Sequence, residues 1–364
     1  MPNPVVKALI GHIEREAAVG GYLAARERAE DQEAVYGSLA RLIGAATSEI
    51  AFMGSATDAW DKAFYSLGLG RGDKIVTAFN EYCANYVAFL HLQKKLDLEI
   101  DVVGPDDNGD IDLGAMRQAI NSGARLVAIS HVPATSGQVN PVAEIGRLAR
   151  EAGVPYLLDA CQSLGQLPVN VKHIGCQMLA GTGRKFLRGP RGCGFLYVAD
   201  DFRQQMEPVF MTNQGGRWVS AGIYEERRDA RVFEVWERNV AVQLAFGAAI
   251  DYLHALDMDW VSGRICALAA RLRVGLAAIR GITICDIGQE LSGIVSFTST
   301  AQSAEEIMRK LRRRGIITQV ARVAHTRLDL EARGIDTAAR LSPHYFILEE
   351  EIDRTLEEIA ALHS

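Results

Sequence analysis

The amino-acid sequence predicts an α/β protein with a mainly parallel sheet in a large domain, followed by a small C-terminal α+β domain. Apolar runs that resemble buried strands alternate with helical patterns through the first two-thirds of the chain, as in doubly wound sheets. The 364 residues also exceed one ordinary hydrophobic core. We therefore expect a large domain over residues 1–250 and a small domain over residues 251–364.

The large domain is expected to contain a series of short, buried strands. These are Lys74–Phe79, Ile100–Val103, Leu126–His131, Tyr156–Asp159, Met178–Gly181 and Gly194–Val198. Helical patterns lie between them at Cys83–Lys95, Leu113–Asn121 and Val142–Glu151, and the last follows Pro141, a favourable residue at a helix start. The alternation predicts that ligands bind at the carboxyl ends of the strands.

The C-terminal part of the chain has a different pattern of helices and strands. A long helical pattern from Val232 to Leu256 leaves the large domain. The elements expected after it are a helix at Gly263–Ile279, a strand at Gly293–Ser299, a helix at Ala304–Arg314, a strand at Ile316–Val320 and a final helix from Glu349. We expect the long helix to join two tightly packed domains.

Composition narrows the class of protein. A net charge of −6 argues against a nucleic-acid or anionic-membrane binder, and no apolar stretch approaches the roughly 20 residues of a membrane span. The N-terminus has no signal-peptide pattern. The six cysteines form no CxxC pair, so neither a disulfide framework nor a zinc site is expected. We expect a cytoplasmic enzyme without a bound metal.

Two residues at strand ends point to a cofactor. Asp159 ends one apolar run, and Lys185 follows the next in Thr182-Gly183-Arg184-Lys185. Pyridoxal phosphate (PLP) requires such a pair, because the lysine holds its aldehyde and the carboxylate keeps its ring nitrogen protonated. Each residue alone has an ordinary interpretation, as a capping aspartate or a solvated lysine.

A phosphate site is suggested before the helical run Asp58–Leu67. Gly54-Ser55-Ala56-Thr57 places small residues with free amides at a helix start, which favours an anion, although Ser55 as a simple N-cap is the commoner arrangement. A dinucleotide site is disfavoured because no GxGxxG follows the first strand, and no GxxxxGK[ST] is present.

The segment GTGRKFLRGPRGCGFLYV, preceded by DACQSLGQLPV, resembles the aminotransferase class V family of fold-type-I PLP-dependent enzymes. Weaker similarity covers GGYLAARE, EIAFMGSATDAW, NEYCAN, HVPATSGQVNP, ARVFEVWERN and LSPHYFILEEEID. The resemblance implies a seven-stranded, mainly parallel sheet in the large domain. The motifs are most similar to the branch of ergothioneine-type C–S lyases and isopenicillin N epimerase.

The resemblance also implies roles for individual residues. Lys185 would be the Schiff-base lysine, Asp159 the partner of the pyridinium, and Tyr82 the residue that stacks on the ring. The remaining implied contacts are Gln162 with the 3′-oxygen, Ala56, Thr57, Thr182 and Arg184 with the phosphate, and Arg340 with the α-carboxylate of an amino-acid substrate. Family members are typically homodimers with sites near the interface, and Gln214–Ser220 lies where a partner chain reaches the phosphate, although a surface loop is the simpler interpretation.

The reaction is inferred from a missing residue. A desulfurase of the family needs a cysteine in the small domain before Arg340, whereas residues 318–339 contain none. Ala134 also replaces an asparagine usual in desulfurases, and Phe346-Ile347-Leu348 replaces a more polar segment. Because the small-domain cysteine is missing, we expect a PLP-dependent lyase that cleaves a C–S bond of an S-substituted cysteine or its sulfoxide by β-elimination, with Tyr82, His325 and His344 as candidate acids. Epimerase and aminotransferase activities remain alternatives, a desulfurase is less favoured, and a non-catalytic PLP-binding protein is least favoured.

Overall fold

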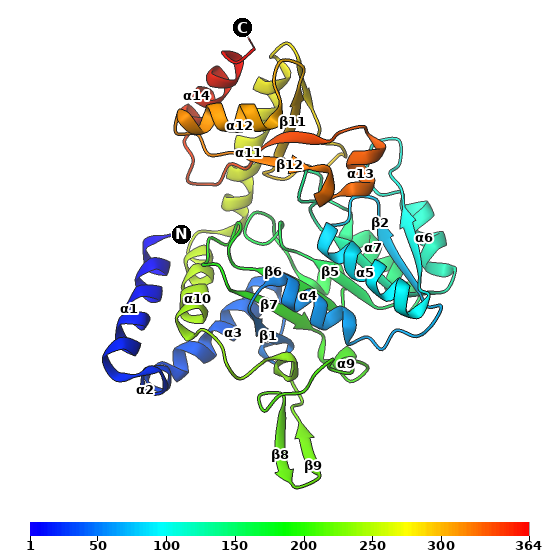
Figure 1. Ribbon diagram of the computed structural model, residues 1–364, viewed down its shortest axis with the longest axis vertical. Coiled ribbons are helices and arrows are strands. Elements are labelled where there is room, and N and C mark those ends of the chain that lie inside the picture. The colour runs from blue at the N-terminus through cyan, green and yellow to red at the C-terminus, as the bar shows by residue number, and fades with distance from the viewer. Residues whose placement is uncertain (364) are drawn as a thin grey trace.

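A seven-stranded sheet runs through the larger part of the molecule (Figure 1), a computed structural model that describes residues 1–363. Its strands are β1 (Ile50–Met53), β2 (Lys74–Ala78), β3 (Glu99–Val103), β4 (Ala124–Ser130), β5 (Tyr156–Asp159), β6 (Met178–Thr182) and β7 (Gly194–Val198). They are arranged in the order β1-β7-β6-β5-β4-β2-β3, with only β7 antiparallel to its two neighbours. The predicted α/β fold with a mainly parallel sheet is confirmed. The sequence analysis did not predict β1.

Helices cover both faces of this sheet. They are α1 (Asn3–Val19), α2 (Gly21–Glu27), α3 (Ala29–Ile43), α4 (Ala56–Tyr65), α5 (Cys83–Leu96), α6 (Leu113–Asn121), α7 (Val142–Glu151), α8 (Val171–Ile174), α9 (Asp200–Arg203) and α10 (Val240–His254). Trp60 of α4 and Phe89 of α5 belong to the core on one face. Leu39 of α3, Ile145 of α7 and Phe246 of α10 belong to the core on the other. The sheet is therefore buried on both sides, as parallel sheets require.

A second, antiparallel sheet lies near the C-terminus. Its strands are β10 (Ile282–Ile284), β11 (Val295–Ser299), β12 (Gln319–Arg322) and β13 (Thr337–Leu341), in the order β10-β11-β13-β12. The helices of this region are α11 (Met258–Ala277), α12 (Ala304–Arg313), α13 (Arg327–Ala332) and α14 (Glu349–Ala360). A separate hydrophobic core joins α11, α12 and α14 to the sheet, and Figure 1 shows this part above the larger sheet. The domain boundary after residue 250 stays a prediction.

Two predicted elements begin later than their apolar patterns suggested. The helix predicted from Val232 begins at Val240, because the Asn239 side chain accepts a hydrogen bond from the Val242 amide and caps the helix there. The strand predicted at Ile316–Val320 begins at Gln319, because the Ile316 amide donates to the Leu311 carbonyl and closes the end of α12 instead. Local hydrogen bonds therefore set these two starts.

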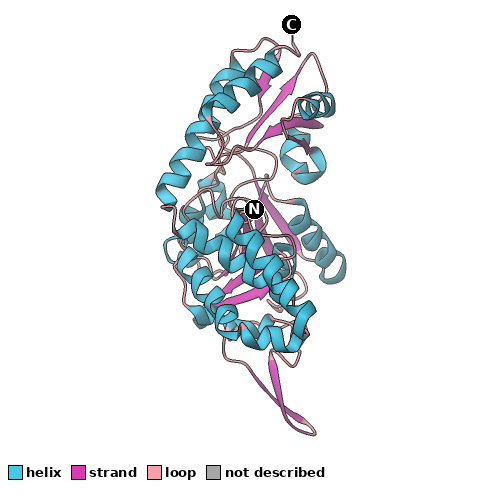
Figure 2. Cartoon of the chain, turned by 90° about the vertical axis from the view of Figure 1, so that its left-hand side faces the viewer, coloured by secondary structure: helices cyan, strands magenta, loops and turns pink. Residues whose placement is uncertain are grey.

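The segment around residues 214–226 forms a projecting hairpin. Strands β8 (Gly216–Ser220) and β9 (Ile223–Glu226) pair with each other alone and extend away from the body (Figure 2). Trp218 is 78% exposed and Tyr224 is 53% exposed. The surface loop considered for Gln214–Ser220 is therefore in large part a strand. Within residues 1–363, no helix combines the length and apolar character needed to cross a membrane.

Candidate active site

A cavity of 530 Å³ lies where the carboxyl ends of β5 and β6 face the antiparallel sheet. It is lined by Tyr82, Ala134, Gln162, Arg184, Lys185, Phe186, Arg191, Gln319, Val320, His325, Arg340, Ser342 and His344. The lining contains four permanently or usually cationic side chains, and none of its residues is acidic or a cysteine. Such a surface favours a ligand that carries more than one negative charge.

Lys185 enters the cavity from the turn after β6. This turn is tightly packed, since a Cβ atom on Gly183 would lie 2.4 Å from the Cys193 Sγ atom and 2.9 Å from the Phe246 ring. The Lys185 Nζ atom lies 6.0 Å from the centroid of the Tyr82 ring. Within the described residues it has no carboxylate or hydrogen-bond partner. The ammonium is therefore available for a ligand.

Asp159 is held at the end of β5 by two donors. The Cys161 amide donates to its Oδ1 atom at 2.9 Å, and the Asn85 side chain donates to its Oδ2 atom at 3.0 Å. Asp159 is buried, with 7% of the surface of the residue exposed. Two bonds leave further lone pairs on the carboxylate, which can accept another N–H group.

Behind Asp159 lies a buried carboxyl group that the sequence analysis missed. Glu81 accepts hydrogen bonds from the Tyr82 amide, from the Asn85 side chain and from both the amide and the hydroxyl of Ser130. Burial raises the pKa of Glu81 to about 7, and nearby Asp159 adds to this, although the donated hydrogen bonds oppose the rise. Glu81 and Asn85 stand one helical turn apart in NEYCAN, so this motif carried the signal.

Arg340 reaches the cavity from β13 of the second sheet. Its Nη1 atom donates to the Ala134 carbonyl at 2.5 Å, whereas its buried Nε atom has no partner in residues 1–363. Burial lowers the pKa of Arg340, and no lining residue supplies a compensating negative charge. A buried guanidinium that lacks an acidic partner favours binding of a carboxylate from a ligand.

The residues predicted to surround the phosphate are only partly brought together. Arg184 lines the cavity and is exposed, and Thr182 ends β6 in a buried position. Ala56 and Thr57 begin α4, which Ser55 caps by accepting from the Asp58 amide, and neither lines the cavity. The start of α4 nevertheless lies beside the large sheet, because a Cβ atom on Gly194 of β7 would approach the Ala56 nitrogen to 2.8 Å.

Three further predictions concern lining residues. The side chain of Gln162 borders the cavity, and its backbone carbonyl accepts from Gln166. Tyr82 is half-buried opposite Lys185, and burial raises the pKa of its hydroxyl. The two histidines differ: His344 bonds the Phe186 carbonyl through Nε2 and the Tyr345 amide through Nδ1, whereas His325 has no hydrogen-bond partner among residues 1–363. No sequence signal separated them.

These residues fit PLP. The cations suit a phosphate and a substrate carboxylate, Lys185 suits an aldehyde, and the buried Asp159 suits a protonated ring nitrogen. Together with the sheet order, they define a fold-type-I PLP-dependent enzyme. The chain belongs to the aminotransferase class-V family, because the sequence model of this family matches residues 1–355. The predicted family and cofactor are confirmed.

Named relatives extend the comparison. The chain is 30% identical to a probable cysteine desulfurase of Methanothermobacter thermautotrophicus, over 99% of this chain and 92% of the relative. It is 29% identical to a cysteine desulfurase of Haloferax volcanii, over 99% of this chain and 83% of the relative. Its structure matches an apo cysteine desulfurase from Thermococcus onnurineus with a TM-score of 0.93 and 26% identity, over 100% of this chain and 92% of that chain.

These relatives correct the predicted reaction. From the sequence, β-elimination from an S-substituted cysteine was predicted ahead of desulfuration, because residues 318–339 contain no cysteine. Full-length relatives named cysteine desulfurase contradict that order. The missing cysteine predicted the reaction less well than similarity over the whole chain did. The absence of one side chain does not determine which group accepts the sulfur atom.

Proposed function

We propose that this protein is a PLP-dependent enzyme that removes the sulfur atom from cysteine. An amino-acid substrate is supported by one observation. Lys185 and Arg340, whose positive charge no acidic lining residue neutralises, line the same cavity. The choice of cysteine rests on the relatives named cysteine desulfurase.

The chain's own residues divide the work between two sides of the cavity. Arg340 binds the substrate carboxylate with its free Nε and remaining N–H groups, which fixes the direction of the amino acid. Lys185 would hold the cofactor through its aldehyde and would take the proton from the substrate Cα atom. This is a task for an amine that is not held by a carboxylate.

The large-domain residues orient the cofactor. Asp159, held by Asn85, would accept the ring N–H, and Tyr82 would stack on the ring. Gln162 would donate to the 3′-oxygen, while Ala56, Thr57, Thr182 and Arg184 would bind the phosphate. When bound, PLP supplies an electron sink for the pair released at the substrate carbon.

We also propose that the protein is a homodimer. The hairpin of β8 and β9 exposes Trp218, Ile223 and Tyr224, which is unusual for a surface that no partner covers. Replacing Trp218 and Ile223 with serine should shift the sedimentation coefficient of the protein from dimer to monomer. A monomeric wild-type protein would contradict this part.

All six cysteines are unpaired in the structure, which supports a reducing compartment such as the cytoplasm.

The direct test is a product assay. The PLP-loaded protein, supplied with L-cysteine and 2-mercaptoethanol, should release alanine and reducible sulfur in equal amounts. The Lys185→Ala variant should lose both alanine release and the absorption band that PLP forms with the protein. Lys172→Ala, an exposed lysine of α8, is the matched control and should keep both. Pyruvate and ammonia in place of alanine would refute desulfuration.

A further inference from the structure

The active-site cavity contains an unassigned group that can exchange a proton. Of its lining residues, Tyr82, Lys185, His325 and His344 can do so under ordinary conditions. Lys185 serves the substrate Cα atom in the proposed function. Burial raises the pKa of Tyr82, which makes its hydroxyl a poor base. His344 is occupied, because both of its ring nitrogens are hydrogen-bonded to the backbone. His325 remains.

His325 is held over the cavity by its neighbours in the chain. It ends the short 3-10 helix η3 (Val323–His325), which connects β12 to α13. The next residue, Thr326, is fully buried and shares a hydrogen bond of 2.6 Å with Thr135 of the large domain. Thr135 directly follows Ala134, whose carbonyl holds Arg340. The imidazole therefore belongs to the same junction as the substrate anchor.

The electrostatic environment of His325 favours its neutral form, which can accept a proton. Burial lowers the pKa of His325, and the positive charges of Arg340 and Arg322 lower it further. The other charged groups of the cavity are Arg184, Lys185 and Arg191, which are also cationic. An imidazole among cations is neutral near pH 7, and its ring nitrogens have no hydrogen-bond partner in residues 1–363.

The same cavity provides no thiol to receive sulfur. No cysteine lines it, and residues 318–339 have none. Cys83 and Cys161 lie near Tyr82 and Asp159, but burial raises the pKa of both thiols and makes them poor nucleophiles. An acceptor thiol must then come from outside the chain, and its proton needs a base.

We propose that His325 is a proton-transfer residue that deprotonates an external thiol and returns the proton to the substrate β-carbon. This inference rests on the proposed function. The acceptor thiol gives its proton to the imidazole, and its sulfur forms an S–S bond with the substrate sulfur. The Cβ–S bond breaks, and its electron pair remains with the substrate carbon. The imidazolium then protonates that carbon, so that one thiol and cysteine yield one persulfide and alanine.

The test compares His325→Gln with His173→Gln, an exposed histidine of α8 that serves as the matched control. With L-cysteine and 2-mercaptoethanol, His325→Gln should lose about 100-fold in kcat, the scale of general acid–base catalysis, with little change in the KM for cysteine. Exchange of the α-hydrogen of L-alanine with deuterated water should persist, because Lys185 performs it. His173→Gln should match the wild type in both assays.

A second measurement does not depend on turnover. In the histidine NMR spectrum of the PLP-loaded wild type, 3-mercaptopropionate should shift the titration of His325, whereas propionate should shift it less because it lacks a thiol. Equal shifts with the two ligands, or full activity of His325→Gln, would overturn the role of His325 while alanine release by the wild type still supports desulfuration. Failure of the wild type to release alanine with any thiol would remove both proposals.

Discussion

Replacing Arg340 with methionine should separate substrate recognition from folding. The guanidinium has one protein hydrogen bond, to the Ala134 carbonyl, and its buried Nε atom has none in residues 1–363. A substrate carboxylate would add two charge-assisted hydrogen bonds, each worth at least about 1.5 kcal/mol. Their loss amounts to about 3 kcal/mol, or about 150-fold in affinity.

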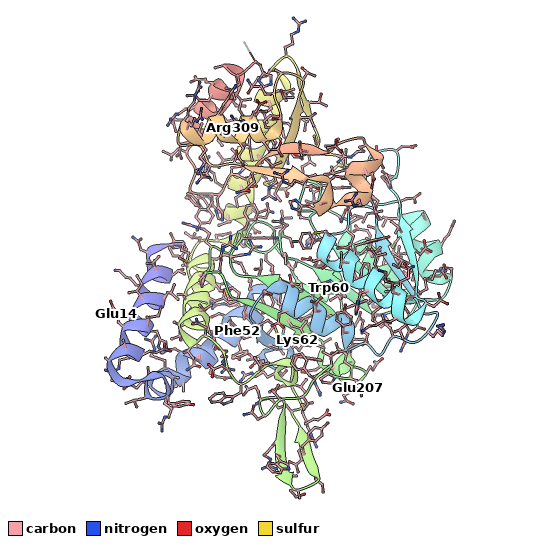
Figure 3. The ribbon with its side chains drawn as sticks, in the orientation of Figure 1. Glu14, Phe52, Trp60, Lys62, Glu207 and Arg309 are labelled. Atoms are coloured by element: carbon pink, nitrogen blue, oxygen red, sulfur yellow. The ribbon has the colours of Figure 1, made fainter. Side chains whose placement is uncertain are left out.

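The assay follows the change in cofactor absorption as amino acids are added to the PLP-loaded protein. Wild-type protein should bind L-alanine far more tightly than L-alaninamide, which lacks the carboxylate, whereas Arg340→Met should bind the two about equally. Arg309→Met is the control, because Arg309 is exposed on α12 (Figure 3) and should leave the preference intact. The melting temperature of Arg340→Met should not fall, since a buried cation without an acidic partner among the lining residues is removed. A preference for alanine that survives in Arg340→Met would refute the anchor.

Three further changes test the scaffold. Asp286→Asn breaks the buried ion pair with Arg273, whose Nε lies 2.8 Å from the carboxylate, and should lower the free energy of unfolding in urea by about 3 kcal/mol. Gly146→Ala places a Cβ atom 1.8 Å from the Ile174 carbonyl oxygen and should lower the free energy of unfolding by about 1–3 kcal/mol. Gly263→Ala, whose Cβ atom would have nothing within 4 Å, should instead stabilise α11 by up to about 1 kcal/mol. Equal changes in the free energy of unfolding for the two variants would contradict the packing. Burial lowers the pKa of His344 from 6.5 to about 4, so the unfolded chain takes up the proton first as the pH falls, and stability should decline across that window by about 3 kcal/mol. Urea unfolding of His344→Gln should show a smaller decline with falling pH than the wild type, and an unchanged slope would disprove the neutral, buried state of this ring.

Much of the larger sheet could be predicted from apolar runs. β5 and β7 begin and end at the predicted residues because both are short, fully buried runs with clear breaks on either side. β1 was missed, since its four residues precede the region where strands and helices visibly alternate. β13 was missed because TAARL has two alanines and an arginine, and its character as a strand comes from pairing with β11 and β12.

The candidate site shows the same division between local and distant information. Lys185 and Asp159 were predicted because each follows a recognisable strand, and the chain brings strand ends of one sheet together. His344 is occupied through the Phe186 carbonyl, and Thr326, next to His325, bonds Thr135; both partners lie more than 150 residues away in the chain. Periodicity and spacing carry no information about such partners.

The cavity takes its lysine from one sheet and its arginine from another, and each sheet has its own hydrophobic core. The residues proposed to hold the cofactor therefore lie in the first part of the chain, and Arg340, the proposed anchor of the substrate, lies in the second. A chimera with another family member would have to exchange residues 258–360 together, because α11 and α14 share the core of the second sheet and Arg273 of α11 pairs with Asp286. Many contacts that cross the junction would also have to be matched, among them Thr135 with Thr326, Ala134 with Arg340 and Gln166 with Gly293. A redesign of amino-acid specificity would therefore have to treat the second sheet, its helices and the junction as one unit.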